Sequence, residues 1–165
     1  MCFHFSDNGG IYLDTDVLVL KSFEPLMKYN LTMGKAATHT LSNGIILSVP
    51  NTQFLCIWFE GYRKYDPKYW GGNSVLMAHA LAEIHPNLVH IEENSLLKPG
   101  WRHSDLMFEK HYDWSNNYAM HIWKRRGKVP DDPAQMDQLN CTLGEVMRYI
   151  YYGSKDLRKP LVTPS

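Results

Sequence analysis

The fold is decided by residues 9–17, which read Gly9-Gly10-Ile11-Tyr12-Leu13-Asp14-Thr15-Asp16-Val17. The apolar run Ile11-Tyr12-Leu13 is typical of a short buried strand, and two aspartates separated by one residue follow it directly. Side chains at positions i and i+2 of an extended chain share one face. The segment therefore predicts a strand whose end presents Asp14 and Asp16 to one divalent cation. The tripeptide Asp14-Thr15-Asp16 alone would also fit a plain turn.

The rest of the chain alternates between strand and helix patterns. We expect strands at residues 17–20, 33–39, 44–49, 88–91 and 118–123, and helices at residues 52–65, 73–84 and 136–152. Asn43-Gly44 marks a strand boundary, Asn73 or Ser74 caps the second helix, and Gly153 ends the last one. Alternating strands and helices predict the α/β fold class.

The amino terminus carries strands almost at once. The apolar runs at residues 11–13 and 17–20 are typical of buried parallel strands, which need neighbours on both sides. Too little sequence precedes them to supply those neighbours, so we expect an N-terminally incomplete fragment. Residues 1–153 form the expected folded body, and residues 154–165 are expected to be a loose C-terminal tail.

Composition excludes several classes of protein. The chain has 165 residues, with 17 Lys and Arg against 17 Asp and Glu, so it has one domain's length and no formal net charge. No long basic run is present, which argues against nucleic acid as a partner. No stretch approaches the roughly 20 apolar residues of a membrane span. The cysteines, Cys2, Cys56 and Cys141, are too scattered for a disulfide framework or a zinc motif.

Three further polar residues are candidates for a site. His121 lies in an apolar strand pattern, where a histidine is either a packed core residue or a cation ligand, with Trp123 on the same strand face. Asn73 is either a helix cap or a contact to sugar hydroxyls. Asn43 suits either turn chemistry or contact with a donor sugar. The sequence pattern alone leaves these alternatives open.

The segment Gly9 to Asp16 resembles the DXD core of glycosyltransferase family 32, the DXD-containing sugar transferases that include α1,4-galactosyltransferases and α1,4-N-acetylglucosaminyltransferases. The resemblance extends, in the family's order, to Asn43-Gly44, Trp70-Gly71-Gly72-Asn73-Ser74-Val75-Leu76 and Tyr118-Ala119-Met120-His121-Ile122-Trp123. It covers most of residues 6–152. Members normally carry a membrane anchor and a nucleotide-binding half ahead of the DXD core, and this sequence shows neither.

The resemblance implies a fold, a reaction and a location. The fold is the C-terminal part of a GT-A domain, a mixed sheet flanked by helices. The reaction is retaining transfer of a hexose, galactose or N-acetylglucosamine, from a UDP-sugar donor to a glycan or glycolipid acceptor. The cofactor is Mn²⁺ or Mg²⁺. The full-length protein is expected in the Golgi lumen.

The resemblance also implies roles for particular residues. Asp14, Asp16 and His121 hold the metal ion, Tyr12, Asp14 and Asn43 contact the nucleotide sugar, and Asn73 and Asp16 are the catalytic residues.

Two other interpretations compete with the transferase. A strand followed by Asp-x-Asp also places the nucleophile and the acid of haloacid-dehalogenase-type phosphatases, but Leu18 stands where that class has Thr or Val. The other alternative is a catalytically inactive truncated remnant, whose sheet edge at residues 11–14 would be unpaired.

Overall fold

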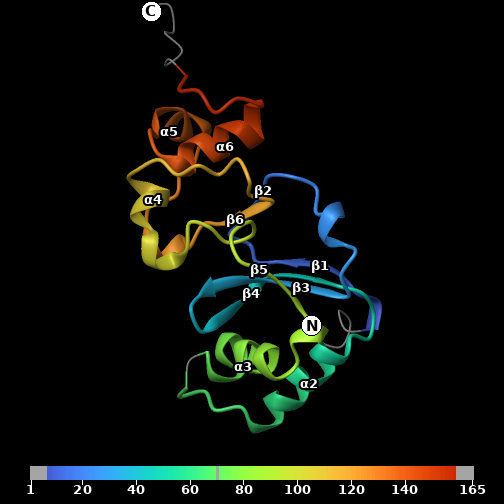
Figure 1. Cartoon of the computed structure of the whole chain (residues 1–165). Helices are drawn as coiled ribbons and strands as arrows, with labels where there is room; N and C mark the ends of the chain where they lie inside the picture. The colour runs from blue at the N-terminus through green and yellow to red at the C-terminus, as the bar shows by residue number, and fades with distance from the viewer. Residues whose placement is uncertain (1–6, 70, 159–165) are drawn as a thin grey trace, which may run out of the picture.

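The computed structural model describes residues 7–69 and 71–158. Within them a four-stranded sheet has the order β1 (Gly10–Leu13), β4 (Thr40–Ser48), β3 (Leu31–Ala37) and β5 (His90–Glu92). A separate two-stranded ribbon joins β2 (Val17–Val19) to β6 (Ala119–His121). The sheet is mixed, because β5 runs parallel to β3 while the other pairs are antiparallel. The predicted α/β class with a mixed sheet flanked by helices is confirmed (Figure 1).

Strand β2 pairs antiparallel with β6 and not as the predicted buried parallel strand. Strand β1 also differs from its prediction as a buried parallel strand. It pairs antiparallel with β4, from Gly10 opposite Ser48 to Leu13 opposite Ile45. In the described part of the chain it has no other sheet neighbour, and 43% of Ile11 is exposed. An apolar run alone does not distinguish an edge strand from a central one, since periodicity reports side-chain burial and not the number of partners.

Strands β3 and β4 form a hairpin whose turn lies at residues 38–39 and not at Asn43-Gly44. Met33 pairs with Ile46, yet Lys35 pairs with Leu41, so the two strands advance by different numbers of residues. The extra residues of β4 bulge out of the ladder around Asn43 and Gly44. The turn-like dipeptide therefore marks a bulge inside a strand, which uses the same conformational freedom as a turn.

Two helices cover one face of the sheet (Figure 1). They are α2 (Gln53–Gly61) and α3 (Met77–Ile84), close to the predictions 52–65 and 73–84. They enclose a core of Leu31, Met33, Leu41, Ile46, Phe54, Trp58, Ala78, Ala82 and Val89. The predicted capping by Asn73 or Ser74 is wrong, because Ser74 has non-helical angles (φ −97°, ψ −108°) inside an irregular turn, Gly72–Leu76.

The opposite face carries the ribbon and the C-terminal helices (Figure 1). Ile45 and Leu47, which alternate with Ile46 along β4, pack against Phe23, Leu26, Leu96 and Leu97. Short turns, Glu24–Leu26, Tyr62–Lys64, Pro86–Leu88, Trp101–His103 and Lys124–Arg126, connect the main elements. A further core of Leu20, Met107, Met120, Ile122, Cys141, Leu143 and Val146 joins the ribbon to helices α4 (Asp105–Phe108) and α6 (Thr142–Tyr152).

The predicted single helix at residues 136–152 is two helices, α5 (Pro133–Gln138) and α6. Leu139 is extended between them (φ −81°, ψ 102°), and Asp132 caps α5 by accepting a hydrogen bond from the Gln135 amide at 2.8 Å. Gly153 ends α6 in the left-handed region (φ 77°), as predicted. Met136 of α5 and Leu143 and Val146 of α6 are all buried, so apolar residues keep a helical spacing across the break.

The predicted tail is attached at its start. The carbonyl of Lys155 accepts a hydrogen bond from Arg148 Nε at 3.0 Å, and the Arg158 guanidinium lies 4.0 Å from the centre of the Tyr152 ring. Lys155 and Arg158 therefore contact α6, although residues 154–158 are all exposed.

The structure also describes the helices and two of the three cysteines that the sequence analysis considered. In residues 7–69 and 71–158, no helix is long and apolar enough to cross a membrane. Of the cysteines, Cys56 and Cys141 are both free, and Cys2 lies outside the described residues.

Gly144 allows α6 to approach the α5–α6 connection. A Cβ there would lie 2.0 Å from the carbonyl oxygen of Leu139 and 2.9 Å from Arg148 Nη1. We expect Gly144→Ala to lower the free energy of unfolding by about 1–3 kcal/mol, because backbone must move to admit the methyl group. Urea denaturation measures the change. Ile150→Ala, at a residue of the same helix that is 47% exposed, is the control. An equal effect of both variants would contradict the packing argument.

Candidate metal and nucleotide-sugar site

Asp14, Asp16 and His121 converge at the junction of the sheet and the ribbon. The two aspartates occupy the turn between β1 and β2, and His121 ends β6, where it pairs with Val17. His121 Nε2 lies 3.6 Å from Asp14 Oδ2 and 3.5 Å from Asp16 Oδ1. One ligand atom from each residue lies within 4.8 Å of the others. The predicted juxtaposition of His121 with both carboxylates is confirmed.

The second oxygen of each carboxylate is held by the surrounding chain. Tyr12 donates its hydroxyl to Asp14 Oδ1 at 2.7 Å, and the Lys124 amide donates to Asp16 Oδ2 at 3.3 Å. These bonds orient Asp14 Oδ2 and Asp16 Oδ1 toward His121. The Asp14 side chain is 36% exposed and that of Asp16 24%, so a solute can reach them, whereas the imidazole is 8% exposed.

Gly44 belongs to the site, although the sequence analysis placed only its neighbour Asn43 there. Its carbonyl accepts the Asp14 amide at 2.8 Å, and its own amide donates to Ser42 Oγ at 3.0 Å. A Cβ at this position would lie 2.8 Å from His121 Cδ2 and 3.0 Å from Asp14 Oδ2. Only glycine leaves room for both side chains, so the bulge in β4 forms the floor of the site. The Asn-Gly dipeptide was the available signal.

Trp123 packs against His121 for a different reason from the predicted strand alternation. Strand β6 ends at His121, and Trp123 adopts the left-handed region (φ 56°), which folds its ring back onto the imidazole at a centroid distance of 3.9 Å. Its indole Nε1 donates to the Pro99 carbonyl at 3.0 Å. The ring is thereby fixed on both sides, and His121 has little freedom to rotate.

The hydrogen bonds of His121 define its tautomer. Its Nδ1 accepts the Trp123 amide at 3.2 Å, so the neutral ring carries its proton on Nε2, which faces the two carboxylates. Coordination of a cation through Nε2 requires the other tautomer and the loss of the Trp123 hydrogen bond. Asp14 and Asp16 are therefore the ligands that the fold presents directly, and His121 is the conditional third.

The donor set fits a divalent cation. Carboxylate oxygens are the ligands preferred by Mg²⁺, Ca²⁺ and Mn²⁺, and imidazole extends the choice toward transition metals. Without a cation the two carboxylates are stabilised by the Tyr12 hydroxyl, the Lys124 amide and the Nε2 proton.

The remaining predicted site residues lie in two different places. Asn43 is exposed on β4 directly beside Gly44, adjacent to the cluster. Asn73 donates its amide to the Gly61 carbonyl at 2.9 Å and accepts the Asp66 amide at 3.4 Å, while its own carbonyl accepts from Trp58 Nε1. These contacts connect α2 to α3, so its predicted catalytic role stays a prediction. Trp70 lies outside the described residues.

Comparison with known proteins identifies relatives of this chain. Over 133 residues it is 33% identical to glucan organizing enzyme 1 of the fungus Cryptococcus neoformans var. grubii, an alignment that covers 71% of this chain and 36% of that protein. Over 133 residues it is 25% identical to the human alpha-1,4-N-acetylglucosaminyltransferase, with coverage of 70% and 38%. Both matches are consistent with a relationship of this chain to the glycosyltransferases. The predicted resemblance to glycosyltransferase family 32 is supported to that extent.

The extent of this relationship is partial. No family model matches the chain. It spans a little over a third of the length of these two curated relatives. Among the described residues, the Asp14–Asp16–His121 cluster is a group of side chains that could hold a metal ion.

Substitution of Gly44 tests the geometry of the cluster. In Gly44→Ala the added methyl group displaces the imidazole or the Asp14 carboxylate by tenths of an ångström, and we expect Mn²⁺ affinity to fall by at least about tenfold, equivalent to about 1.4 kcal/mol. Isothermal titration calorimetry measures the affinity. Thr15→Ala, an exposed residue of the same turn, is the control and should bind as the parent does. Unchanged Mn²⁺ affinity in Gly44→Ala would contradict the argument that Gly44 leaves room for Asp14 and His121.

Proposed function

We propose that this chain carries the cation- and diphosphate-binding part of a retaining sugar transferase with a GT-A fold. The observation that carries the proposal is the convergence of Asp14, Asp16 and His121 in a chain related to sugar transferases. Two adjacent carboxylates at a strand end have the chemistry to hold one divalent cation between protein and diphosphate. The open side of the cluster, where both carboxylates are partly exposed, is where the diphosphate docks.

The residues of the cluster have separable tasks in this reaction. A bound Mn²⁺ or Mg²⁺ would supply positive charge to offset the charge of a departing diphosphate. Asp14 and Asp16 hold the cation, and Tyr12 fixes the orientation of Asp14. His121 completes the set after its tautomer changes. We assign Asp16 as the catalytic residue because its carboxylate is fixed from the ribbon side by the Lys124 amide.

The donor and acceptor follow from the relatives and from the neighbouring chain. Because the human relative is named as an alpha-1,4-N-acetylglucosaminyltransferase, we propose a UDP-sugar donor carrying N-acetylglucosamine or galactose, with Tyr12, Asp14 and Asn43 near the nucleotide sugar. The acceptor is a glycan or glycolipid, and the full-length protein acts in the Golgi lumen. The cluster offers no separate carboxylate nucleophile, so attack on the same face as the leaving group accounts for retention.

The cationic turn Lys124–Arg126 supports the same assignment. It follows Trp123 directly, and its first amide already binds Asp16. Cationic side chains here offset charge on a diphosphate leaving group. A phosphatase of the haloacid-dehalogenase type has less support, because neither relative is named as a phosphatase.

Donor binding tests the proposal. We expect the chain to bind UDP-N-acetylglucosamine or UDP-galactose in the presence of Mn²⁺, and Asp16→Asn to weaken that binding by at least about tenfold, because one cation ligand loses its charge. Calorimetry measures binding, and transfer of labelled sugar to a glycan acceptor measures activity. Thr15→Ala should behave as the parent. Hydrolysis of p-nitrophenyl phosphate without binding of either UDP-sugar would establish the phosphatase, and retention of donor affinity in Asp16→Asn would refute the metal assignment.

A further inference from the structure

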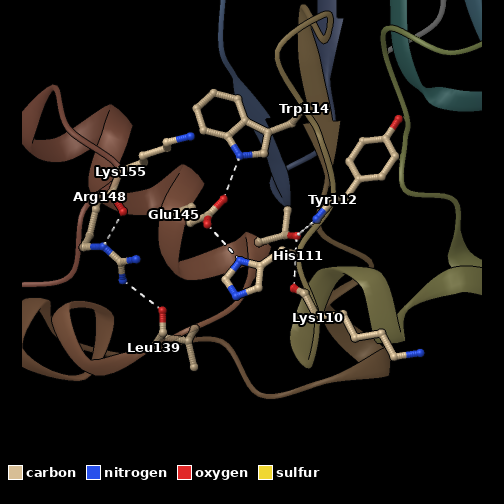
Figure 2. Close-up of polar contacts among 9 residues, drawn as sticks. Lys110, His111, Tyr112, Trp114, Leu139, Glu145, Arg148 and Lys155 are labelled. Carbon is tan, nitrogen blue, oxygen red and sulfur yellow. Dashed lines mark hydrogen bonds and ion pairs between the residues drawn. The ribbon is translucent and has the colours of Figure 1, made fainter.

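A polar cavity lies between α6 and the segment that connects α4 to β6. Its volume is about 390 Å³, and its walls include His111, Asp113, Trp114, Ser115, Glu145 and Lys155. None of these residues belongs to the Asp14–Asp16–His121 cluster. Figure 2 shows this region, with Glu145 on α6 hydrogen-bonded to His111 and Trp114. We call it the α6 cavity; it falls in the size range of small-molecule sites.

The wall of the α6 cavity is organised by Glu145. One carboxylate oxygen lies 2.8 Å from His111 Nδ1, and the other accepts from Trp114 Nε1 at 3.2 Å (Figure 2). The fully buried Thr142 accepts the Tyr112 amide at 2.8 Å and donates to the Lys110 carbonyl at 3.2 Å. The segment from Lys110 to Trp114 is therefore fastened to the first turns of α6 before any ligand arrives.

Arg148 positions Lys155, which lines the α6 cavity. It is 1% exposed, and its guanidinium donates to the carbonyls of Met136, Leu139 and Lys155 at 2.9, 2.9 and 3.0 Å. Figure 2 shows the bonds to Leu139 and Lys155. These bonds fold the chain after α6 back along the helix, which brings Lys155 to the rim of the α6 cavity. Arg148 is a positioning residue, since it shapes the α6 cavity without lining it.

The chemistry of the α6 cavity selects among ligands. A phosphate would meet the carboxylates of Asp113 and Glu145, and a simple cation would meet the ammonium of Lys155, so the mixed charges disfavour either ion. The Ser115 amide donates to Asp113 at 3.0 Å and keeps the pKa of that carboxyl below its usual value, which leaves an anionic acceptor at the rim. The α6 cavity thus offers acceptors and donors side by side.

The aromatic side chains supply the apolar part of the site. Trp114 lines the α6 cavity, and the half-exposed Tyr149 lies tilted beside it at a centroid distance of 5.1 Å. The Lys21 ammonium donates to the Ser115 carbonyl and fixes the loop that follows Trp114. A sugar ring has apolar C–H faces and hydroxyl groups around its edge. The faces match the indole of Trp114, and the hydroxyls match the charged acceptors and donors around it.

We propose that the α6 cavity binds a neutral hexose unit of an oligosaccharide, with the sugar ring against Trp114 and its hydroxyls on Asp113, Glu145 and Lys155. This site is separate from the cation cluster and needs neither metal nor nucleotide. It gives the chain a second contact with carbohydrate, independent of sugar transfer.

The test uses the full chain without Mn²⁺ or nucleotide sugar. Maltotriose, laminaritriose and N-acetyllactosamine are titrated separately into ¹⁵N-labelled protein, and the indole N–H resonance of Trp114 is followed by NMR. A saturable shift with at least one of them is expected. Asp113→Asn and Lys155→Ala, both at exposed positions, should each weaken binding by about tenfold or more, the loss of one or two hydrogen bonds to charged groups.

Matched variants separate this site from its surroundings. Lys110→Ala removes an exposed lysine outside the α6 cavity and should leave sugar binding unchanged. Asp16→Asn should also leave it unchanged, which keeps the outcome distinct from that of the proposed transferase. The proposal is overturned if no sugar gives a saturable shift, if Asp113→Asn and Lys155→Ala bind like Lys110→Ala, or if inorganic phosphate competes for the α6 cavity.

Discussion

The pairing of β2 with β6 is the constraint on which the structure depends. Val17 faces His121 across this ribbon, although about a hundred residues separate them. The ribbon is extended at one end by the Ile122 amide on the Asp16 carbonyl at 2.8 Å and at the other by the Leu20 amide on the Tyr118 carbonyl at 2.9 Å. Closing so long a loop costs conformational entropy, which is offset by the apolar core of Met120, Ile122, Leu143 and Val146 behind the ribbon.

This pairing turns a local motif into a site. The turn at Asp14-Thr15-Asp16 alone would place two negative charges close together, an unfavourable arrangement. The ribbon brings the Nε2 proton of His121 to 3.5–3.6 Å from both carboxylates, while Tyr12 and the Lys124 amide bind their other oxygens. Backbone and side-chain donors therefore hold the carboxylates in position for a cation to take the place of the His121 Nε2 proton.

In the C-terminal helices, a buried guanidinium holds segments from different parts of the chain together. Arg148 is buried among carbonyl oxygens, and the three that it binds come from α5, from the α5–α6 connection and from the chain after α6. Charged hydrogen bonds to carbonyls compensate for the loss of water around a guanidinium. One side chain thus holds three segments together, one of which carries Lys155 of the α6 cavity.

The sequence by itself determined the α/β class, most helix and strand positions, the carboxylate pair and the relationship to sugar transferases. These are local properties, since apolar periodicity and a short motif are written in neighbouring residues. Only the tertiary structure decided that β1 lies at an edge, that Asn43-Gly44 is a bulge, that Asn73 joins two helices, and that Gly44 and Trp123 shape the site around His121. Each of these depends on strands paired over long separations and on side chains meeting at van der Waals distance, which residue order along the chain does not specify.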